Sequence, residues 1–305
     1  MIQYAGPWLD GAAAPILFCN METMYFTLAG ADFRLDTHIP LEITAELREF
    51  CIPRPGRTDG WIRVSAVPRL PAPAAGGVRF DRRLFEYHPD EERVFHDRGP
   101  GTEPDALVRY GTGGQIRLVL RSGFPGPELP SHLLVNLLGL ERVLLELDAL
   151  LLHASFIRFR GRGILFSAPS GTGKSTQAAL WAAHRGAEIL NGDRAAIRCT
   201  DGQWRSYGLP LAGSSRIYRN ESAPIEAIVV LGRAPEDRIR PLSPAEALRA
   251  LLPEFSVHRW DSTFVERVLD ISTALVQAVP VYLLECTPEQ SAVELLHRTL
   301  RKGGL

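Results

Sequence analysis

The sequence predicts an α/β protein in which a mixed-sheet core with a phosphate-binding loop follows a mostly β domain. Three observations support this prediction. Residues 1–128 contain short β-type runs separated by turns rich in proline and glycine, and residues 129–305 mix apolar strands with helical patterns. Between one strand and one helix lies Ser170-Gly-Thr-Gly-Lys-Ser-Thr176, and a glycine-bearing loop in that place is typical of nucleotide-binding proteins.

The composition indicates an ordinary soluble globular protein and argues against several functions. Of the 305 residues, 45% are hydrophobic and 23% are charged, and the formal net charge is −1, as in average globular domains. Because the charge is balanced, no basic surface for nucleic acid or an anionic membrane is predicted. The N-terminus lacks a signal-type segment, and charged residues interrupt the most apolar region, 133–157. We therefore expect a cytoplasmic protein with neither a nucleic-acid partner nor a membrane partner.

Residues 1–128 are expected to form a small, mostly β domain. This segment holds most of the 23 prolines of the chain, and its apolar runs end at turn clusters. No group of catalytic residues is evident in it, so plain packing and a role in substrate docking or assembly both remain open. The predicted strands include 16–19, 24–28, 60–64 and 116–120, and a predicted hairpin joins 85–87 to 94–95.

Residues 129–305 are predicted to form the mixed-sheet core. Ser131 is a candidate helix N-cap, and apolar residues at helical spacing extend this helix to about Leu147. Gly186 fits a helix C-cap, and Asp201-Gly202 fits a hairpin turn. Strands next to hairpins, together with helices, indicate a mixed sheet rather than repeated βαβ units. The predicted strands are 150–157, 163–166, 188–193, 195–199, 203–207, 225–231 and 279–285, and the predicted helices are 131–147, 175–185, 244–252, 262–279 and 289–301.

The segment 168–176 fits the phosphate-binding pattern G-x-x-x-x-G-K-[ST], with alanine in place of the first glycine. Gly171 and Gly173 permit backbone angles at which successive N–H groups point at one anion. The next helix adds its positive end, Lys174 can reach the outer phosphates, and the hydroxyl of Ser175 can join the shell of Mg²⁺. The predicted ligands are ATP and Mg²⁺, and the predicted nucleotide-binding residues are Ser170, Gly171, Thr172, Gly173, Lys174, Ser175 and Thr176.

Two further residues are candidates for the chemistry around this loop. Asp193 ends a short strand that lies one helix after the loop, and it is favoured as a second Mg²⁺ ligand. The reason is that a helix followed directly by a strand can return the chain beside the loop. Glu285 is the alternative acid, and capping of a turn is the alternative role of Asp193. His153 lies in the strand before the loop, where a core histidine and a catalytic histidine both fit the pattern.

The order of these motifs resembles the order of motifs in the catalytic core of the HPr kinase/phosphorylase family. That family shares its fold with phosphoenolpyruvate carboxykinases. The resemblance is closer to HPr-kinase-related proteins encoded beside peptide-modification clusters, including lasso-peptide tailoring kinases. It covers about residues 150–300 and implies a P-loop kinase core, whereas residues 1–128 are not part of it. The matching segments are Leu152-His-Ala-Ser, Arg160-Gly-Arg-Gly163, Ser170-Gly-Thr-Gly-Lys-Ser-Thr176, Arg185-Gly186 and Asn191-Gly-Asp193.

The resemblance implies a role for each matching position. His153 corresponds to the active-site histidine of the family. Lys174 and Ser175 correspond to its phosphate and Mg²⁺ contacts, and Asp193 corresponds to the second of two adjacent acids. The first acid, which serves the family as the base toward the acceptor hydroxyl, corresponds to Gly192, so either Asp193 takes both roles or His153 orients or deprotonates the acceptor. No acid matches the glutamate before the family's next glycine-rich segment, so a dedicated kinase is expected rather than a phosphorylase.

Two other segments hold candidates for contact with the acceptor or the transferred phosphate. Residues 208–216 are small, polar and flexible in composition, and Ser214 and Arg216 are the candidate contacts within them. In a second segment, Arg259 offers positive charge to the transferred group. An ordinary surface connection and a helix-entry cap are the alternative explanations of the two segments.

The resemblance implies an ATP- and Mg²⁺-dependent kinase that transfers the γ-phosphate to a hydroxyl, with serine of a peptide or protein as the expected acceptor. A small hydroxy metabolite, such as a free amino acid, is the alternative acceptor. A catalytically weakened, nucleotide-binding regulatory module is the alternative from a different class, and Gly192 favours it. HPr kinases are oligomeric, so the resemblance also implies a homo-oligomer.

Overall fold

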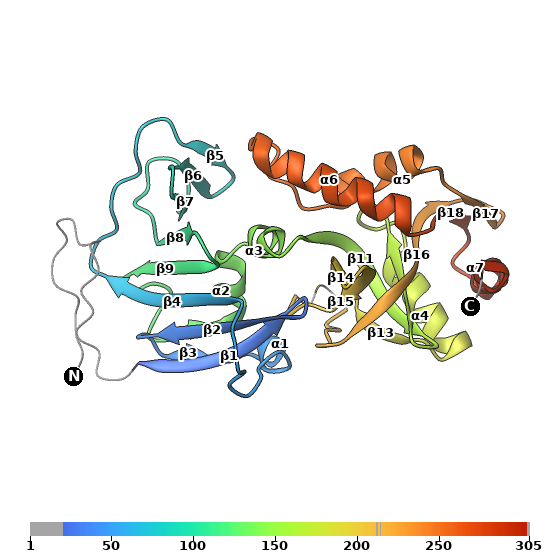
Figure 1. Ribbon diagram of the computed structural model, residues 1–305, viewed down its shortest axis with the longest axis horizontal. Helices are drawn as coiled ribbons and strands as arrows, with labels where there is room; N and C mark the ends of the chain where they lie inside the picture. The colour runs from blue at the N-terminus through green and yellow to red at the C-terminus, as the bar shows by residue number, and fades with distance from the viewer. Residues whose placement is uncertain (1–20, 212, 214, 304–305) are drawn as a thin grey trace.

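The structure of the protein is a computed structural model that describes residues 21–303 except positions 212 and 214. It is a mixed α/β structure in which two eight-stranded sheets stand side by side, one from each half of the chain (Figure 1). The predicted strand 16–19 and the candidate residue Ser214 lie outside the described residues. No helix within the described part of the chain is long and apolar enough to cross a membrane.

The first sheet is formed by the N-terminal half of the chain. Its strands are β1 (Glu22–Leu28), β2 (Ala31–Thr37), β4 (Gly60–Val67), β5 (Val78–Phe80), β6 (Arg83–Tyr87), β7 (Glu91–His96), β8 (Ala106–Gly111) and β9 (Gln115–Arg121). They lie in the order β1-β2-β4-β9-β8-β7-β6-β5, with parallel pairs only at β2–β4 and β4–β9. The predicted hairpin is confirmed, because Phe85 of β6 lies opposite Val94 of β7. This half also contains the parallel pair β3 (Leu41–Glu42) and β10 (Leu129–Pro130), and helix α1 (Ala45–Arg48).

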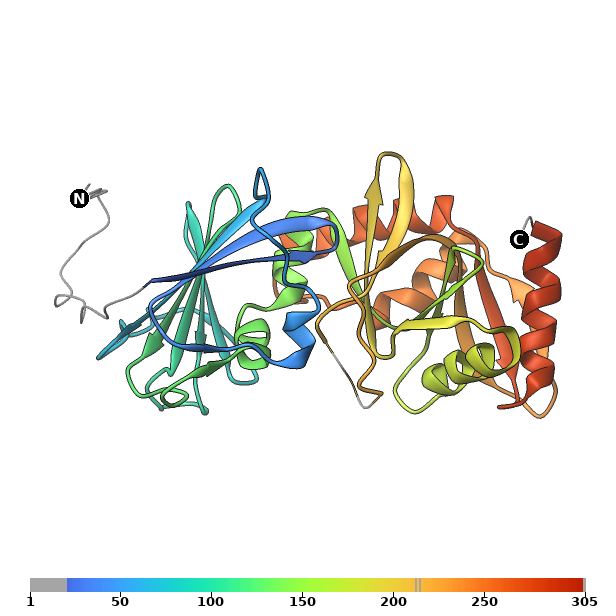
Figure 2. The same ribbon diagram turned by 90° about the horizontal axis from the view of Figure 1, so that it is seen from below.

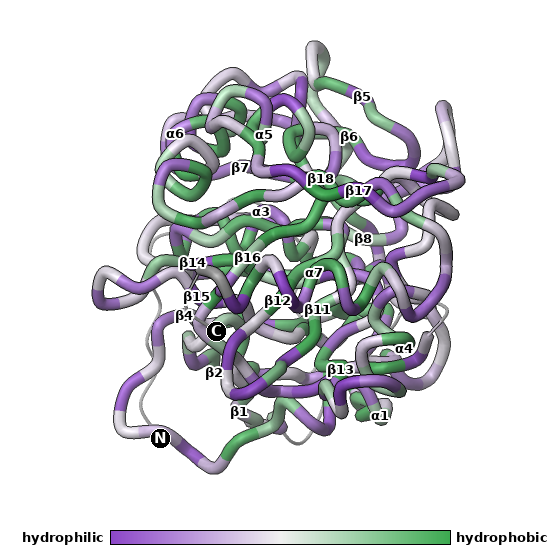
Figure 3. The backbone as a smooth tube through the Cα atoms, turned by 90° about the vertical axis from the view of Figure 1, so that its right-hand side faces the viewer, coloured by the Kyte–Doolittle hydropathy of each residue, from purple (hydrophilic) through white to green (hydrophobic). Residues whose placement is uncertain are grey.

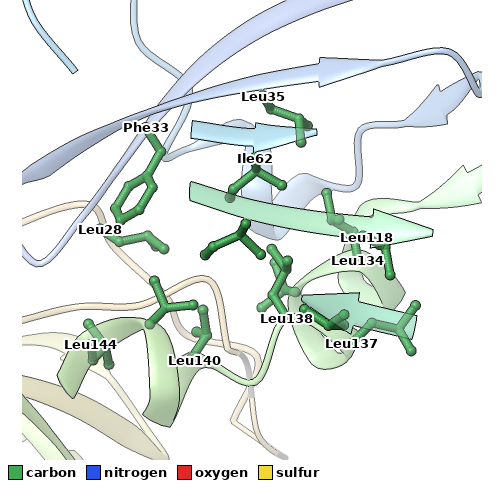
Figure 4. Close-up of a cluster of buried hydrophobic side chains, with 14 of the residues drawn as sticks. Leu28, Phe33, Leu35, Ile62, Leu118, Leu134, Leu137, Leu138, Leu140 and Leu144 are labelled. Carbon is green, nitrogen blue, oxygen red and sulfur yellow. The ribbon is translucent and has the colours of Figure 1, made fainter. Parts of the chain in front are cut away.

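Two helices, α2 (Ser131–Leu137) and α3 (Leu140–Glu146), pack on the first sheet. The prediction of one continuous helix over 131–147 is wrong, because Gly139 adopts a left-handed conformation (φ 57°) between them. This turn lets both helices keep leucines against the strands, as Figure 4 shows. The shared hydrophobic cluster joins Leu134, Leu138, Leu140 and Leu144 of this segment to Leu28, Leu35, Ile62 and Leu118 of the strands.

The second sheet is mixed, as the sequence predicts. Its strands are β11 (Ala149–Phe159), β12 (Arg162–Ser167), β13 (Glu188–Asn191), β14 (Arg194–Thr200), β15 (Gln203–Tyr207), β16 (Ser222–Arg233), β17 (Arg238–Pro241) and β18 (Val281–Cys286). β11 pairs in antiparallel fashion with β12, β13 and β14. β12 is parallel to β16, which is parallel to β18. The remaining pairs are antiparallel, and they include the predicted hairpin of β14 and β15.

Helices cover both faces of the second sheet (Figure 2). They are α4 (Lys174–Arg185), α5 (Pro244–Leu251) with the short 3-10 helix η1 (Leu252–Glu254), α6 (Ser262–Ala278) and α7 (Gln290–Gly303). α4 and α7 share one hydrophobic core, and α5 and α6 share the core on the opposite face. Leu165 and Phe166 of β12 belong to different cores, as consecutive strand residues do. Strands covered on both faces are mainly apolar, and stretches of β11 and β16 are accordingly green in Figure 3.

Polar and aromatic side chains join the two halves of the chain. Glu141 of α3 accepts hydrogen bonds from Arg83 of β6 (2.9 Å) and from His258 (3.2 Å), which precedes α6. Burial alone would raise the pKa of Glu141, but these two partners outweigh it and lower the pKa to about 2. Trp260 stacks on Phe80 of β5 with 4.5 Å between the ring centroids. These contacts hold the segment before α6 against the first sheet.

We predict that Gly139→Ala lowers the free energy of unfolding by about 1–2 kcal/mol, because a left-handed conformation is unfavourable for residues with a Cβ atom. The added Cβ would also lie 3.3 Å from the hydroxyl oxygen of Tyr110. Urea or thermal unfolding measures the effect. Gly126→Ala is the matched control, since no atom lies within 4 Å of the position of a Cβ there and its φ is not positive. Equal stability of the two variants would contradict the assigned role of Gly139.

Candidate functional site

The loop between β12 and α4 has the backbone shape that its glycines predict. Gly171 (φ 79°) and Gly173 (φ 127°) both have positive φ, although nothing would obstruct a Cβ atom at either position. Glycine is therefore required for conformation rather than for space. α4 begins at Lys174, so its unpaired N–H groups and the positive end of its dipole face the loop. This arrangement can bind an anion such as a phosphate group.

The loop lies at the carboxyl edge of the parallel strands of the second sheet. β12 runs directly into it, and β16 and β18 end at a pocket that the loop also lines. The helix that follows β12 packs on one face of the sheet, whereas α6, which precedes β18, packs on the other. In open α/β sheets, ligands bind at the carboxyl ends of strands where the connections divide between the two faces. The fold thus places a ligand site at this edge.

Lys174 is held inside the loop. It is 7% exposed, and its Nζ donates to the carbonyl oxygens of Ala168 (2.7 Å) and Pro169 (3.4 Å). Burial lowers the pKa of Lys174, and the carboxylates of Glu254 and Asp193 oppose that shift.

The chain uses lysine almost nowhere else. Of its 34 basic residues, only Lys174 and Lys302 are lysine, and all others are arginine. Lysine is a compact charge on a flexible stem, whereas arginine is a planar fork, so the two are not interchangeable where geometry matters. The use of lysine at position 174, in a chain that otherwise uses arginine almost throughout, agrees with a role that depends on this geometry. This signal is readable from the sequence and supports the choice of Lys174.

Two acids and a histidine from distant parts of the chain meet near the loop. His153 lies in the middle of β11, with its Nδ1 2.9 Å from Oε2 of Glu254 and its Nε2 3.7 Å from Oδ1 of Asp193. Asp193 reaches this position because its carbonyl oxygen accepts a hydrogen bond from the N–H of Ala154 (3.0 Å). The structure therefore brings His153 and Asp193 together. Glu254 is not predicted from the sequence, because it lies 101 residues from His153 and belongs to no recognisable motif.

The buried side chain of Asn191 fixes the turn that carries Asp193. Its Oδ1 accepts hydrogen bonds from the N–H groups of Asp193 (3.0 Å) and Arg194 (3.1 Å). Its Nδ2 donates to the carbonyl oxygens of Leu209 (3.0 Å) and Leu211 (3.2 Å). Asn191 has no exposed surface, and these four bonds satisfy its amide. One side chain thus ties the turn to the segment that follows β15.

Two residues of that segment, Gly213 and Ser215, pack against Asp193 and Gly192. A Cβ atom at Gly192 would lie 1.9 Å from Oγ of Ser215, and one at Gly213 would lie 2.5 Å from Cβ of Asp193. Both positions must therefore be glycine while the segment keeps its place. Ser215 occupies the space that a side chain at position 192 would need. The packing of Ser215 therefore excludes an acidic residue at that position.

The other candidate residues lie in separate places. Arg216 belongs to the segment that follows β15 and has a positive φ of 51°. Ser214 belongs to the same segment but lies outside the described residues. Arg259 is exposed in the segment before α6 and makes no ion pair with any residue that the structure describes. Glu285, the alternative acid, is exposed on β18 and is not among the carboxylates around His153.

A pocket of about 390 Å³ opens next to the loop. Arg233, at its edge, donates from Nη2 to the carbonyl oxygen of Gly171. The volume lies within the range of pockets that hold small organic ligands. Its lining consists of residues 171–173 of the loop, Thr176 and Gln177 of α4, and residues 231–234 and 286–288 at the ends of β16 and β18.

Ser175 and Asp193 are the residues that fit a Mg²⁺ ion. The Oγ of Ser175 lies 3.5 Å from the carbonyl oxygen of Gly192, directly beside Asp193 in the chain. Mg²⁺ prefers oxygen ligands and binds through one or two protein groups, completing its shell with water and phosphate. A hydroxyl and a carboxylate match that partial coordination. In residues 21–303, as far as they are described, no group of three His, Cys, Asp or Glu side chains could hold a metal by itself.

Comparisons with known proteins identify a family. No curated protein matches the chain. Among solved structures, the Hpr(Ser) kinase/phosphatase from Coxiella burnetii matches with 14% sequence identity and a TM-score of 0.30, over 50% of this chain and 97% of that chain. The family model described as SynChlorMet cassette protein ScmC matches residues 133–300, more than half of the chain. The chain therefore belongs to the ScmC family of SynChlorMet cassette proteins.

Proposed function

We propose that the protein is an ATP- and Mg²⁺-dependent kinase that transfers the γ-phosphate to a hydroxyl group, with serine of a peptide or protein as the acceptor. The observation that carries the proposal is the meeting of His153 and Asp193, 3.7 Å apart, beside the helix that begins at Lys174, where Oγ of Ser175 lies 3.5 Å from the carbonyl oxygen of Gly192. Candidate phosphate contacts and candidate proton acceptors thus share one site. The order of these motifs, which resembles that of HPr kinases, supports the same chemistry.

The proposed orientation of ATP follows from the loop and the adjacent pocket. The N–H groups of the loop and the N-terminus of α4 bind the phosphates, and Lys174 neutralises part of their charge. The nucleoside lies in the pocket bordered by Gln177 and Arg233. The γ-phosphate then reaches the ammonium group of Lys174, and the next residue, Ser175, places its Oγ 3.5 Å from the carbonyl oxygen of Gly192, which precedes Asp193.

The residues around His153 supply the remaining functions. Ser175 and Asp193 hold the Mg²⁺ ion, which when bound neutralises charge on the phosphate oxygens. Two groups can accept the proton of the acceptor hydroxyl: the carboxylate of Asp193 and Nε2 of His153. Most of the rate gain in phosphoryl transfer comes from positioning and electrostatic stabilisation, so a fixed arrangement of these side chains is the main contribution of the protein.

The segment that contains Gly213, Ser215 and Arg216 is the proposed acceptor-binding segment. Gly213 packs against Asp193, and a few residues later Arg219 forms an ion pair (3.4 Å) with Glu49 at the end of α1. The acceptor side of the site therefore borders the N-terminal half of the chain. A peptide or protein extends beyond its reacting serine and can contact this second folded surface, so we favour it over a free amino acid as the acceptor.

A nucleotide-binding regulatory module is the second candidate function. Ser215 fills the space of a side chain at position 192, so the site has one acid where the resemblance would place two. Such a module binds Mg·ATP without transferring its phosphate.

Incubation with Mg²⁺ and ATP labelled at the γ-phosphate tests the proposal. The acceptors are serine-containing peptides encoded beside the gene, together with free serine and free threonine. We expect alkali-labile label in a peptide. Asp193→Asn should lower the rate about 100-fold, because a metal ligand and a candidate base lose their charge. Asp201→Asn, at the exposed turn between β14 and β15, is the matched control and should keep the wild-type rate.

The other outcomes of this assay separate the alternatives. Label found only in the free amino acids would assign the small-molecule acceptor and contradict the peptide substrate. Binding of Mg·ATP with no label in any acceptor would contradict the kinase and favour the regulatory module.

We predict that Lys174→Arg weakens Mg·ATP binding about ten-fold or more although it keeps the positive charge. The ammonium group is enclosed by the carbonyl oxygens of Ala168 and Pro169, and a planar guanidinium cannot reproduce that geometry. A lost hydrogen bond to a charged group costs about 1.5–3 kcal/mol. Titration calorimetry measures the dissociation constant. Arg162→Lys, at the exposed start of β12, is the control, and wild-type affinity in Lys174→Arg would refute the role of Lys174.

A further inference from the structure

We infer that Glu254 is a positioning residue that fixes His153 as the base of the reaction and leaves Asp193 to hold the metal. The inference rests on the proposed function and selects between its two candidate proton acceptors. Its basis is the placement of the Glu254 carboxylate against Nδ1 of His153, at 2.9 Å.

The backbone fixes Glu254 beside β11. Glu254 is the last residue of η1, which follows α5 directly. The next residue, Phe255, is buried in the core under the sheet and forms a β-bridge with Leu152. Leu152 precedes His153 in β11, so the bridge brings Glu254 alongside the histidine. The position of the carboxylate therefore depends on packed backbone and not on a mobile loop.

The contact with Glu254 determines which nitrogen of His153 carries the proton. The side chain of Glu254 is only 9% exposed, and a buried carboxylate needs a donor. Nδ1–H of His153 donates to it, so the lone pair of the neutral imidazole lies on Nε2. The same arrangement of carboxylate and histidine positions the base in serine hydrolases.

Nε2 of His153 is left available for the acceptor. Its distance of 3.7 Å from Oδ1 of Asp193 is too long for a hydrogen bond. The other oxygen of Asp193 lies 3.6 Å from Nε of Arg194. The side chains become more exposed from Glu254 (9%) through His153 (23%) to Asp193 (37%), so Nε2 is on the open side of the pair.

Glu254 and Asp193 are the two carboxylates that contact His153 among the described residues. Position 192 cannot provide a third, because Ser215 fills the space beside Gly192. Arg194, whose Nε lies 3.6 Å from Asp193, cannot accept a hydrogen bond from Nδ1. Among the described carboxylates, Glu254 is therefore the one placed to orient the imidazole through its Nδ1.

The proposed step moves one phosphoryl group and one proton. The acceptor oxygen bonds to the γ-phosphorus, the bond between that phosphorus and the β–γ bridging oxygen breaks, and ADP leaves with that oxygen. The proton of the acceptor hydroxyl moves to Nε2 of His153, and the carboxylate of Glu254 stabilises the resulting imidazolium. The proton then passes to water.

Glu254→Gln tests the inference, because it keeps the shape of the side chain and removes its charge. We expect kcat to fall about 10- to 100-fold, with unchanged affinity for Mg·AMP-PNP and partial recovery in Glu254→Asp. Glu266→Gln, on the exposed side of α6, is the matched control. In a His153→Ala background, Glu254→Gln should cost no further activity, because Glu254 acts through His153. The inference would be overturned if the kcat of the double variant fell by the product of the two single effects. It would also be overturned if Glu254→Gln weakened Mg·AMP-PNP binding as much as it lowered kcat.

The tautomer of His153 provides a readout that requires no phosphate transfer. In protein labelled with nitrogen-15 at its eight histidines, the signal that disappears in His153→Ala identifies His153. We expect a protonated Nδ1 and an unprotonated Nε2 in the wild type, and a mixture of tautomers in Glu254→Gln. A proton on Nε2 in the wild type would overturn the inference even if the protein is a kinase. The expected tautomer without any phosphate transfer would support the positioning by Glu254 and count against the proposed function.

Discussion

The side-chain amide of Asn191 is the interaction on which the candidate site depends. It is fully buried, and its four hydrogen bonds join the turn that carries Asp193 to the segment after β15. Each buried backbone group left without its partner would cost about 1–3 kcal/mol, so the turn and the segment keep one relative position. That position sets the distance from Asp193 to His153. It also places Ser215 in the space beside Gly192.

Strand β11 is the second element that fixes the geometry of the site, because it carries His153. Ala149 and Leu151 belong to the core of the first sheet, whereas Phe156 and Ile157 belong to the two cores of the second sheet. His153 lies between these anchors and receives Glu254 through the bridge at Leu152. Sites carried on packed strands hold their geometry better than sites on loops. The histidine and its carboxylate thus have a rigid support on packed backbone.

The sequence predicts the second half of the chain well because its signals are local. Hydrophobic periodicity predicts its strands and helices, and the order of the motifs identifies His153 and Asp193, which the structure brings together. Glu254 could not be found this way, since its contact with His153 spans 101 residues. The same limit applies to the first sheet, where local patterns identify strands but not the parallel pairing of β2, β4 and β9. Hydrophobic periodicity predicts a single helix across Gly139, because one glycine barely changes the apolar stripe. The positive φ of Gly139, which periodicity does not detect, divides the stretch into two helices.

In the proposed complex, the triphosphate lies along the loop, with its γ-phosphate beside Lys174 and the pair formed by His153 and Asp193. A crystal structure with Mg·AMP-PNP tests this arrangement. We predict that the nucleoside occupies the pocket bordered by Gln177 and Arg233 and that the γ-phosphate accepts a hydrogen bond from Nζ of Lys174. A triphosphate that runs in the opposite direction, or that binds away from the loop, would contradict the account.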